Sequence, residues 1–137
     1  MKEIYLAGGC FWGTQQYIKQ IEGVIETEVG YANGSTPSPT YEEVYTDQTG
    51  YAETVRIKYD EAKVGLDLIL ELYFCSIDPT SLNRQGADCG TRYRTGIYYT
   101  TPHDLPIIEQ VYRNVEAQYD TPLAVEIEPL HNFYAAE

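Results

Sequence analysis

The stretch "LAGGCFWG" at residues 6–13 places a cysteine after two glycines and before two large aromatic residues. A short apolar run that is typical of a strand ends at Ala7, and Gly8 and Gly9 interrupt it. From Cys10 onward, apolar residues recur at helical spacing. The stretch therefore predicts a turn from a strand into a helix, with Cys10 at the start of that helix.

A cysteine at the start of a helix has a particular chemistry. The free N–H groups and the helix dipole at that point stabilise an anion, so the thiol of Cys10 loses its proton more easily there. The thiolate is the nucleophilic form of cysteine. Gly8 and Gly9 allow a sharp turn that leaves the sulfur open, and Phe11 and Trp12 could form an apolar wall beside it. The position favours a nucleophile, and a cysteine packed in a glycine turn is the alternative.

Length and charge bound the class of protein. The chain has 137 residues, of which 43% are hydrophobic and 22% charged, and it carries a formal net charge of −12. We expect a single domain over residues 1–137. The negative charge argues against nucleic acid and anionic membranes as partners. Because we find neither a membrane-spanning run nor a signal peptide, we expect a cytoplasmic protein.

The cysteines do not indicate a disulfide framework. There are three of them, an odd number, and a reducing compartment disfavours structural disulfides. No cysteine–histidine pair has the spacing of metal ligands. We therefore expect neither a metal nor another cofactor.

Hydrophobic periodicity predicts an alternation of strands and helices. The expected strands are residues 3–7, 25–31, 53–59, 95–99 and 124–128. The expected helices are residues 10–23, 64–77 and a third that Asp104 and Pro106 open. This order is the split βαβ pattern of an α+β fold, a ferredoxin-like two-layer sandwich extended at its C-terminal end. We expect a mixed sheet with the helices on one face.

Two of these elements come with a predicted buried face. The alternation in residues 25–31 places Ile25 on the same side as the other apolar residues of that strand. In the second helix, Leu68, Leu72 and Cys75 share one face. We therefore expect Cys75 to be a packing residue rather than a reactive one.

Glu53 is a candidate general acid. It lies on the same strand face as Val55 and Ile57, so it is expected to point inward. An inward carboxylate without an obvious cationic partner on its strand is costly to ionise, which suits an acid that must hold its proton. The alternative is a strand-end glutamate that reaches solvent.

The long loop at residues 78–92 and the residue after it supply two further candidate site residues. Asp88 and Tyr93 stand on either side of a Gly-Thr turn near the end of this loop. Loops of that length inside a compact domain are often functional. Turn capping and packing are the alternative roles for both residues.

Six blocks together resemble the peptide methionine sulfoxide reductase A family. They are "GGCFWG", "VGYANG", "PTYEEV", "TGYAETVRIKYD", "DPTSLNRQGADCGTRYRTGIYY" and "HNFYAAE". The resemblance runs from residue 4 to residue 137. By this resemblance Cys10 matches the catalytic cysteine, Phe11 and Trp12 match the aromatic pair that holds the substrate methyl group, and Asp88 matches an acidic residue of the binding site.

The resemblance also implies a reaction. Glu53 matches the acid that protonates the sulfoxide oxygen, and Tyr41 and Tyr93 match the tyrosines that hydrogen-bond it. The expected activity is reduction of the S epimer of free or peptide-bound methionine sulfoxide. Attack by Cys10 gives a sulfenic acid, which thioredoxin or another thiol then reduces.

Three residues depart from the common pattern of that family. Gln15 replaces a glutamate, for which we expect a supporting or capping role, and Tyr51 replaces a histidine. Cys89 stands beside Asp88, where other members usually carry no thiol. Many members also carry resolving cysteines in a C-terminal tail beyond the point where this sequence ends.

Cys89 leaves two interpretations open. It is a candidate resolving cysteine that forms a disulfide with Cys10, or a bystander that faces away from the site. A binding module that recognises methionine sulfoxide or an apolar side chain without turnover is the alternative to an enzyme. Consumption of methionine sulfoxide in the presence of dithiothreitol distinguishes the two.

Overall fold

The computed structural model describes residues 2–8, 11–34, 50–85 and 88–136. In chain order the elements are β1 (Lys2–Ala7), α1 (Phe11–Ile18), β2 (Val24–Ala32), β3 (Ala52–Tyr59), α3 (Leu66–Cys75), β4 (Arg84–Gln85), β5 (Asp88–Cys89), the 3-10 turn η1 (Thr91–Tyr93), β6 (Gly96–Tyr99), the 3-10 turn η2 (Pro102–Asp104), α4 (Leu105–Glu116), β7 (Glu126–Pro129) and β8 (Phe133–Ala135). No helix among these residues is both long and apolar enough to cross a membrane.

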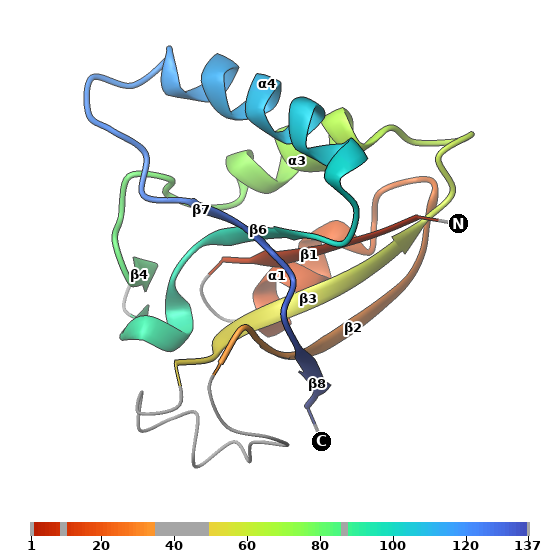
Figure 1. The fold of residues 1–137 in the computed structure, drawn as a ribbon, viewed down its shortest axis with the longest axis horizontal. Helices are drawn as coiled ribbons and strands as arrows, with labels where there is room; N and C mark the ends of the chain where they lie inside the picture. Colours follow the sequence, from red (N-terminus) through yellow and green to blue (C-terminus); the bar gives the residue numbers. More distant parts are fainter. Residues whose placement is uncertain (1, 9–10, 35–49, 86–87, 137) are drawn as a thin grey trace.

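Six strands form one mixed sheet in the order β7-β6-β1-β3-β2-β8. The neighbouring pairs are antiparallel except β6 and β7, which are parallel. Helix α3 packs against both α1 and α4, and α3 and α4 run alongside each other (Figure 1). The predicted α+β fold with a mixed sheet is therefore confirmed.

Alternation along the strands separates two cores. One core joins alternate residues of the central strands, such as Ile4 and Leu6 of β1, to the buried sides of the three described helices. The smaller core holds Tyr5 and Ala7 of β1 on the other face, where the C-terminal segment packs through Phe133. The ring of Phe133 meets that of Tyr5 edge to face, with centroids 5.1 Å apart. The described helices thus lie on one face, as predicted.

Three differences from the prediction concern the extent and the number of the helices and strands. Helix α1 ends at Ile18 rather than near Gly23, because the chain tightens into turns: the N–H of Ile21 donates to the carbonyl of Ile18 at 3.0 Å. Part of the predicted loop at residues 78–92 forms the β4–β5 hairpin and η1. Strand β8 had no counterpart in the prediction.

The prediction that Ile25 is buried is wrong. Val24 pairs with Tyr59 and Glu26 pairs with Lys58, so Ile25 is the extra residue of a β-bulge between them. The bulge turns the side chain of Ile25 outward, where 52% of it is exposed. The regular alternation of β2 holds only beyond the bulge.

The predicted buried face of α3 is also wrong. The buried residues of this helix are Leu66, Ile69, Leu70, Tyr73 and Phe74. Leu68 and Cys75 are exposed instead, and Leu72 is half-buried. Two sides of the helix carry apolar residues, so helical spacing alone fits two faces, and the side with the aromatic residues Tyr73 and Phe74 is the one that is buried. Cys75 is therefore a surface thiol and not a packing residue.

The hydroxyl of Tyr73 connects α3 to two strands of the sheet. It donates a hydrogen bond to the carbonyl of Ala7 at the end of β1 and accepts one from the N–H of Gly96 at 3.2 Å. The side chain is fully buried, and burial holds the pKa of this phenol well above its usual value. Tyr73 therefore fixes the end of β1 against the start of β6.

Tyr73→Phe should destabilise the protein by about 1–3 kcal/mol, because it leaves the N–H of Gly96 and the carbonyl of Ala7 without this buried partner. Chemical denaturation followed by far-UV circular dichroism measures the change. Tyr112→Phe is the matched control, since that hydroxyl makes one long bond of 3.4 Å to the carbonyl of Leu123, and we expect a loss of about 0.5 kcal/mol. Equal losses in the two variants would contradict the role given to Tyr73.

Candidate active site

The register of the sheet brings three segments together where β1 ends. Ala7, the last residue of β1, pairs with Thr54 of β3 on one side and with Gly96 of β6 on the other. Glu53 is the next residue of β3 toward this end, and Tyr93 comes three residues before Gly96. The same end of the sheet therefore receives Glu53, Tyr93 and the turn that leads from β1 into α1.

Glu53 is buried at this end of the sheet. Only 2% of the residue is exposed, and it pairs with Tyr31 of β2 in the strand register. Its side chain leaves β3 on the same face as Val55 and Ile57, which belong to the core beneath the helices. The predicted inward orientation is confirmed, and the alternative of a glutamate that reaches solvent is wrong. Its role as an acid stays a prediction.

Tyr93 is held by the short turn η1, which packs against β3. Its N–H donates to the carbonyl of Gly90 at 3.0 Å, and Gly90 has a φ of 127°, a conformation that favours glycine. The guanidinium carbon of Arg92 lies 4.4 Å from the centre of the Tyr93 ring. Both side chains are buried. Tyr93 is therefore a positioned phenol close to the strand that carries Glu53.

Arg92 is a feature of this region that sequence reasoning missed. Arginine is rarely this buried, so the burial of Arg92 beside Tyr93 indicates that it belongs to the same candidate site. The signal in the sequence was the short stretch "GTRYR", in which an arginine directly precedes the candidate tyrosine. That stretch does not by itself say which of its two arginines is buried.

Helix α1 carries a surface hollow beside the end of β1. The hollow has a volume of about 340 Å³ and is lined by Gly8, Gly13, Thr14, Tyr17 and Ser76. The hydroxyl of Thr14 donates to the carbonyl of Gly8 at 3.0 Å, which ties the helix to the turn before it. A Cβ added to Gly13 would meet no atom of the described residues within 4 Å.

Gly8 is required by packing. A Cβ built on this residue would lie 2.7 Å from Cγ2 of Ile77 and 3.3 Å from Cε1 of Tyr73. A side chain at this position would therefore push the end of β1 away from the end of α3. The sequence suggested that Gly8 is needed for a sharp turn. In the structure, the close packing of Ile77 and Tyr73 against its backbone requires a glycine.

The remaining predicted site residues are described in part. Cys10 and Tyr41 lie outside the described residues, and only the backbone of Phe11, Asp88 and Cys89 is described. Trp12 lies at the start of α1 with its side chain more than half exposed. The β5 residues pair with β4, Asp88 with Gln85 and Cys89 with Arg84, so both lie in a hairpin that contacts η1.

Gln15 and Tyr51 both support the structure around this end of the sheet. The side-chain amide of Gln15 donates to the hydroxyl of Thr27 at 3.1 Å and so joins α1 to β2. This is a supporting contact between elements and not a helix cap. Tyr51 is buried just before β3, and its ring meets that of Tyr134 in β8 edge to face at 6.1 Å.

A metal would need a cluster of ligands. In the part of the chain that the structure describes, the histidine, cysteine, aspartate and glutamate residues form no group of three or more that could hold a metal ion.

Comparison with known proteins places these observations in a family. The model of the family described as "Peptide methionine sulfoxide reductase" matches residues 2–137. A relative from Clostridium acetobutylicum, named peptide methionine sulfoxide reductase MsrA, is 53% identical over 137 residues, which cover 100% of this chain and 85% of the relative.

Solved structures agree with the family model. The crystal structure of reduced Mxr1 from Saccharomyces cerevisiae is 35% identical with a TM-score of 0.93, and the match covers 99% of this chain and 80% of Mxr1. Mxr1 in complex with Trx2 also matches, at 26% identity and a TM-score of 0.73, over 99% of this chain and 81% of that one. The chain therefore belongs to the peptide methionine sulfoxide reductase family.

Proposed function

We propose that this protein reduces the S epimer of methionine sulfoxide, free or within a polypeptide, to methionine, with Cys10 as the nucleophile. Membership of the family supports the reaction and favours an enzyme over a binding module without turnover. The assignment of residues rests on one observation. Glu53 is buried at the end of the sheet where β1 ends and the chain continues to Cys10 and α1.

The sulfur of a sulfoxide is a weak electrophile, so its oxygen must be protonated before a thiolate can displace it. Glu53 supplies that proton, because its carboxyl group is buried at the end of the sheet where β1 ends and the chain continues to Cys10. The Cys10 thiolate gives two electrons and takes the oxygen, the sulfoxide is reduced to the thioether, and the proton stays on the new sulfenic acid. Atoms and electrons balance without a cofactor.

The other predicted residues bind and orient the substrate. Tyr41 and Tyr93 donate hydrogen bonds to the sulfoxide oxygen and share its developing charge. The buried position of Tyr93 in η1, next to β3, supports this role. Phe11 and Trp12 enclose the methyl group, and Asp88 contributes to the polar side of the binding site.

A second thiol must return Cys10 to its reduced state. We propose thioredoxin as that reductant, since Mxr1 has been solved in complex with Trx2. Such a reductant acts in a reducing compartment, which agrees with the proposed cytoplasmic location. Cys89 either resolves the sulfenic acid within the chain or takes no part, and the two routes differ in the first disulfide formed.

The finer fold description is also an inference. Strands β1, β2, β3 and β6 are interleaved, with α1 connecting β1 to β2 and α3 connecting β3 to β6. We infer that this unit is a ferredoxin-like split βαβ sandwich, and that β7 and β8 extend its two edges.

Cys10→Ser should abolish reduction of methionine sulfoxide while the fold is retained, because serine is far less nucleophilic than a thiolate. The assay is the consumption of methionine sulfoxide with dithiothreitol as reductant. Cys75→Ser is the control, since Cys75 is exposed on α3, and it should keep full activity and stability. An active Cys10→Ser variant would show that another residue is the nucleophile.

Glu53→Gln keeps the shape of the side chain but removes the acidic proton. We expect the turnover rate to fall about 10²-fold or more, within the range that general acid catalysis supplies, while substrate binding survives. Glu53→Asp retains the acid on a shorter side chain and should recover part of the rate. Turnover of Glu53→Gln near that of the wild type at neutral pH would remove Glu53 from the mechanism.

The route of regeneration can be read from one turnover without reductant. If Cys89 resolves the sulfenic acid, peptide mass analysis finds a disulfide between Cys10 and Cys89, while the exposed Cys75 remains open to alkylation. A Cys10 sulfenic acid that persists, with Cys89 still alkylatable, excludes the resolving role. The same experiment on Cys89→Ser should leave the sulfenic acid in place under either route.

A further inference from the structure

A second pocket lies at the opposite end of the sheet from Glu53. It has a volume of about 630 Å³, which falls in the range of small-molecule sites. Its walls include Lys2 at the start of β1, Tyr59 at the end of β3 and residues of α3 and α4. Tyr59 lies six positions after Glu53 along β3, which corresponds to about 20 Å. The pocket is therefore separate from the candidate active site.

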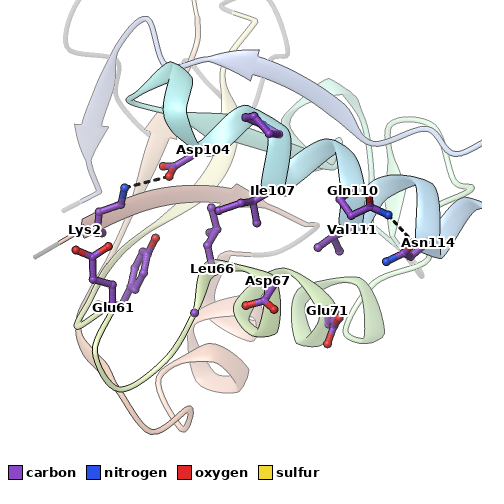
Figure 2. A pocket seen from close by; sticks show the side chains of 13 residues that line it. Lys2, Glu61, Leu66, Asp67, Glu71, Asp104, Ile107, Gln110, Val111 and Asn114 are labelled. Carbon is purple, nitrogen blue, oxygen red and sulfur yellow. Dashed lines mark hydrogen bonds and ion pairs between the residues drawn. The ribbon is translucent and has the colours of Figure 1, made fainter.

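The walls of this pocket are strongly acidic. Four carboxylates line it, from Glu61, Asp67, Glu71 and Asp104, against the single ammonium group of Lys2. Lys2, Glu61 and Asp104 gather at one end, while Asp67 and Glu71 follow along α3 (Figure 2). A cationic ligand would be attracted to both parts of this wall.

Asp104 gives the first sign of a missing partner. It was expected to cap α4, but its side chain makes no capping hydrogen bond. The residue is only 2% exposed, and Oδ1 lies 3.1 Å from Nζ of Lys2. Oδ2 is buried with no hydrogen-bond partner among the described residues. A buried carboxylate oxygen without a donor is costly, so this end of the pocket lacks a hydrogen-bond donor.

Tyr59 gives the second sign. It is 1% exposed and lines the pocket, yet its hydroxyl makes no hydrogen bond to any residue within the described ranges. Burial, and then the nearby charges of Asp104 and Glu61, raise the pKa of this phenol well above its usual value. The neutral hydroxyl therefore lies near two carboxylates at the wall of the pocket, where a ligand can bond to it.

The wall between the two acidic parts is apolar. Leu66 and Val111 contribute buried side chains, and Ile107 lines the same space with 41% of its surface exposed. A chain of methylene groups would cover Ile107 and remove apolar surface from water. The pocket thus combines acidic groups toward its ends with an apolar stretch between them.

We propose that this pocket binds a linear aliphatic polyamine. One ammonium group donates to Glu61 and to the hydroxyl of Tyr59, where the nearby charge of Asp104 also attracts it, and the methylene chain lies over Ile107. A further ammonium group lies beside the carboxylates of Asp67 and Glu71, which are four residues apart and share a face of α3. This binding activity goes beyond the reduction of methionine sulfoxide and does not depend on Cys10.

Calorimetric titration of the full chain with spermidine in about 0.15 M NaCl tests the proposal, since salt at that level screens diffuse attraction. We expect saturable binding of one spermidine per chain. The pocket variant Glu61→Gln/Asp67→Asn/Glu71→Gln should bind at least about tenfold more weakly. All three residues are exposed, so these substitutions leave the core intact.

Two further variants distinguish binding in this pocket from nonspecific attraction of spermidine to an acidic protein. The variant Glu109→Gln/Glu116→Gln/Asp120→Asn changes the net charge equally at exposed positions outside the pocket, and it should bind spermidine like the wild type. Tyr59→Phe leaves the net charge unchanged and should weaken binding about tenfold. Absence of saturation, an equal loss in the two triple variants, or unchanged affinity of Tyr59→Phe would each overturn the proposal.

Discussion

The hydrogen bonds of the Tyr73 hydroxyl connect the helix layer to the sheet and fix the end of β1 against the start of β6. The hydroxyl lies in the core with no access to water, and its partners are the backbone groups of Ala7 and Gly96, which stand side by side on neighbouring strands. A polar group in such a place must be bonded, so α3 can dock in one position only. Gly8, the residue after β1, also lies close to the Tyr73 ring, so the same side chain positions the end of β1.

This dependence explains which features the sequence could predict. The inward orientation of Glu53 follows from the period of two in β3, a local property that neighbouring Val55 and Ile57 already display. The bond from Tyr73 to Ala7 joins residues 66 positions apart, and no local pattern signals it. Strand β8 was missed for the same reason: its three residues become a strand by pairing with β2.

Other differences arose where one pattern fits two structures. Apolar residues lie on two sides of α3, so the spacing of Leu68 and Cys75 is as helical as that of the residues that are in fact buried. Ile25 fitted the alternation of its strand until a bulge shifted it by one position. Asp104 stands where a helix cap is expected, but Lys2 at the far end of the sequence competes for its carboxylate. In each case a partner distant in sequence decides the outcome.

The acidic groups of this protein are neutralised unequally over its surface. Along the sheet, the guanidinium of Arg56 bonds three carboxylates, with Nε 3.1 Å from Glu28, Nη2 2.7 Å from Glu26 and Nη1 in contact with Glu3. The fork of donors on arginine allows one cation to serve several oxygens. Lys2 offers a compact charge instead and bonds one oxygen of Asp104, while the other has no hydrogen-bond partner among the residues that the structure describes. The local deficit of cationic donors therefore falls in the pocket between α3 and α4, where a ligand with several ammonium groups would supply what the chain does not.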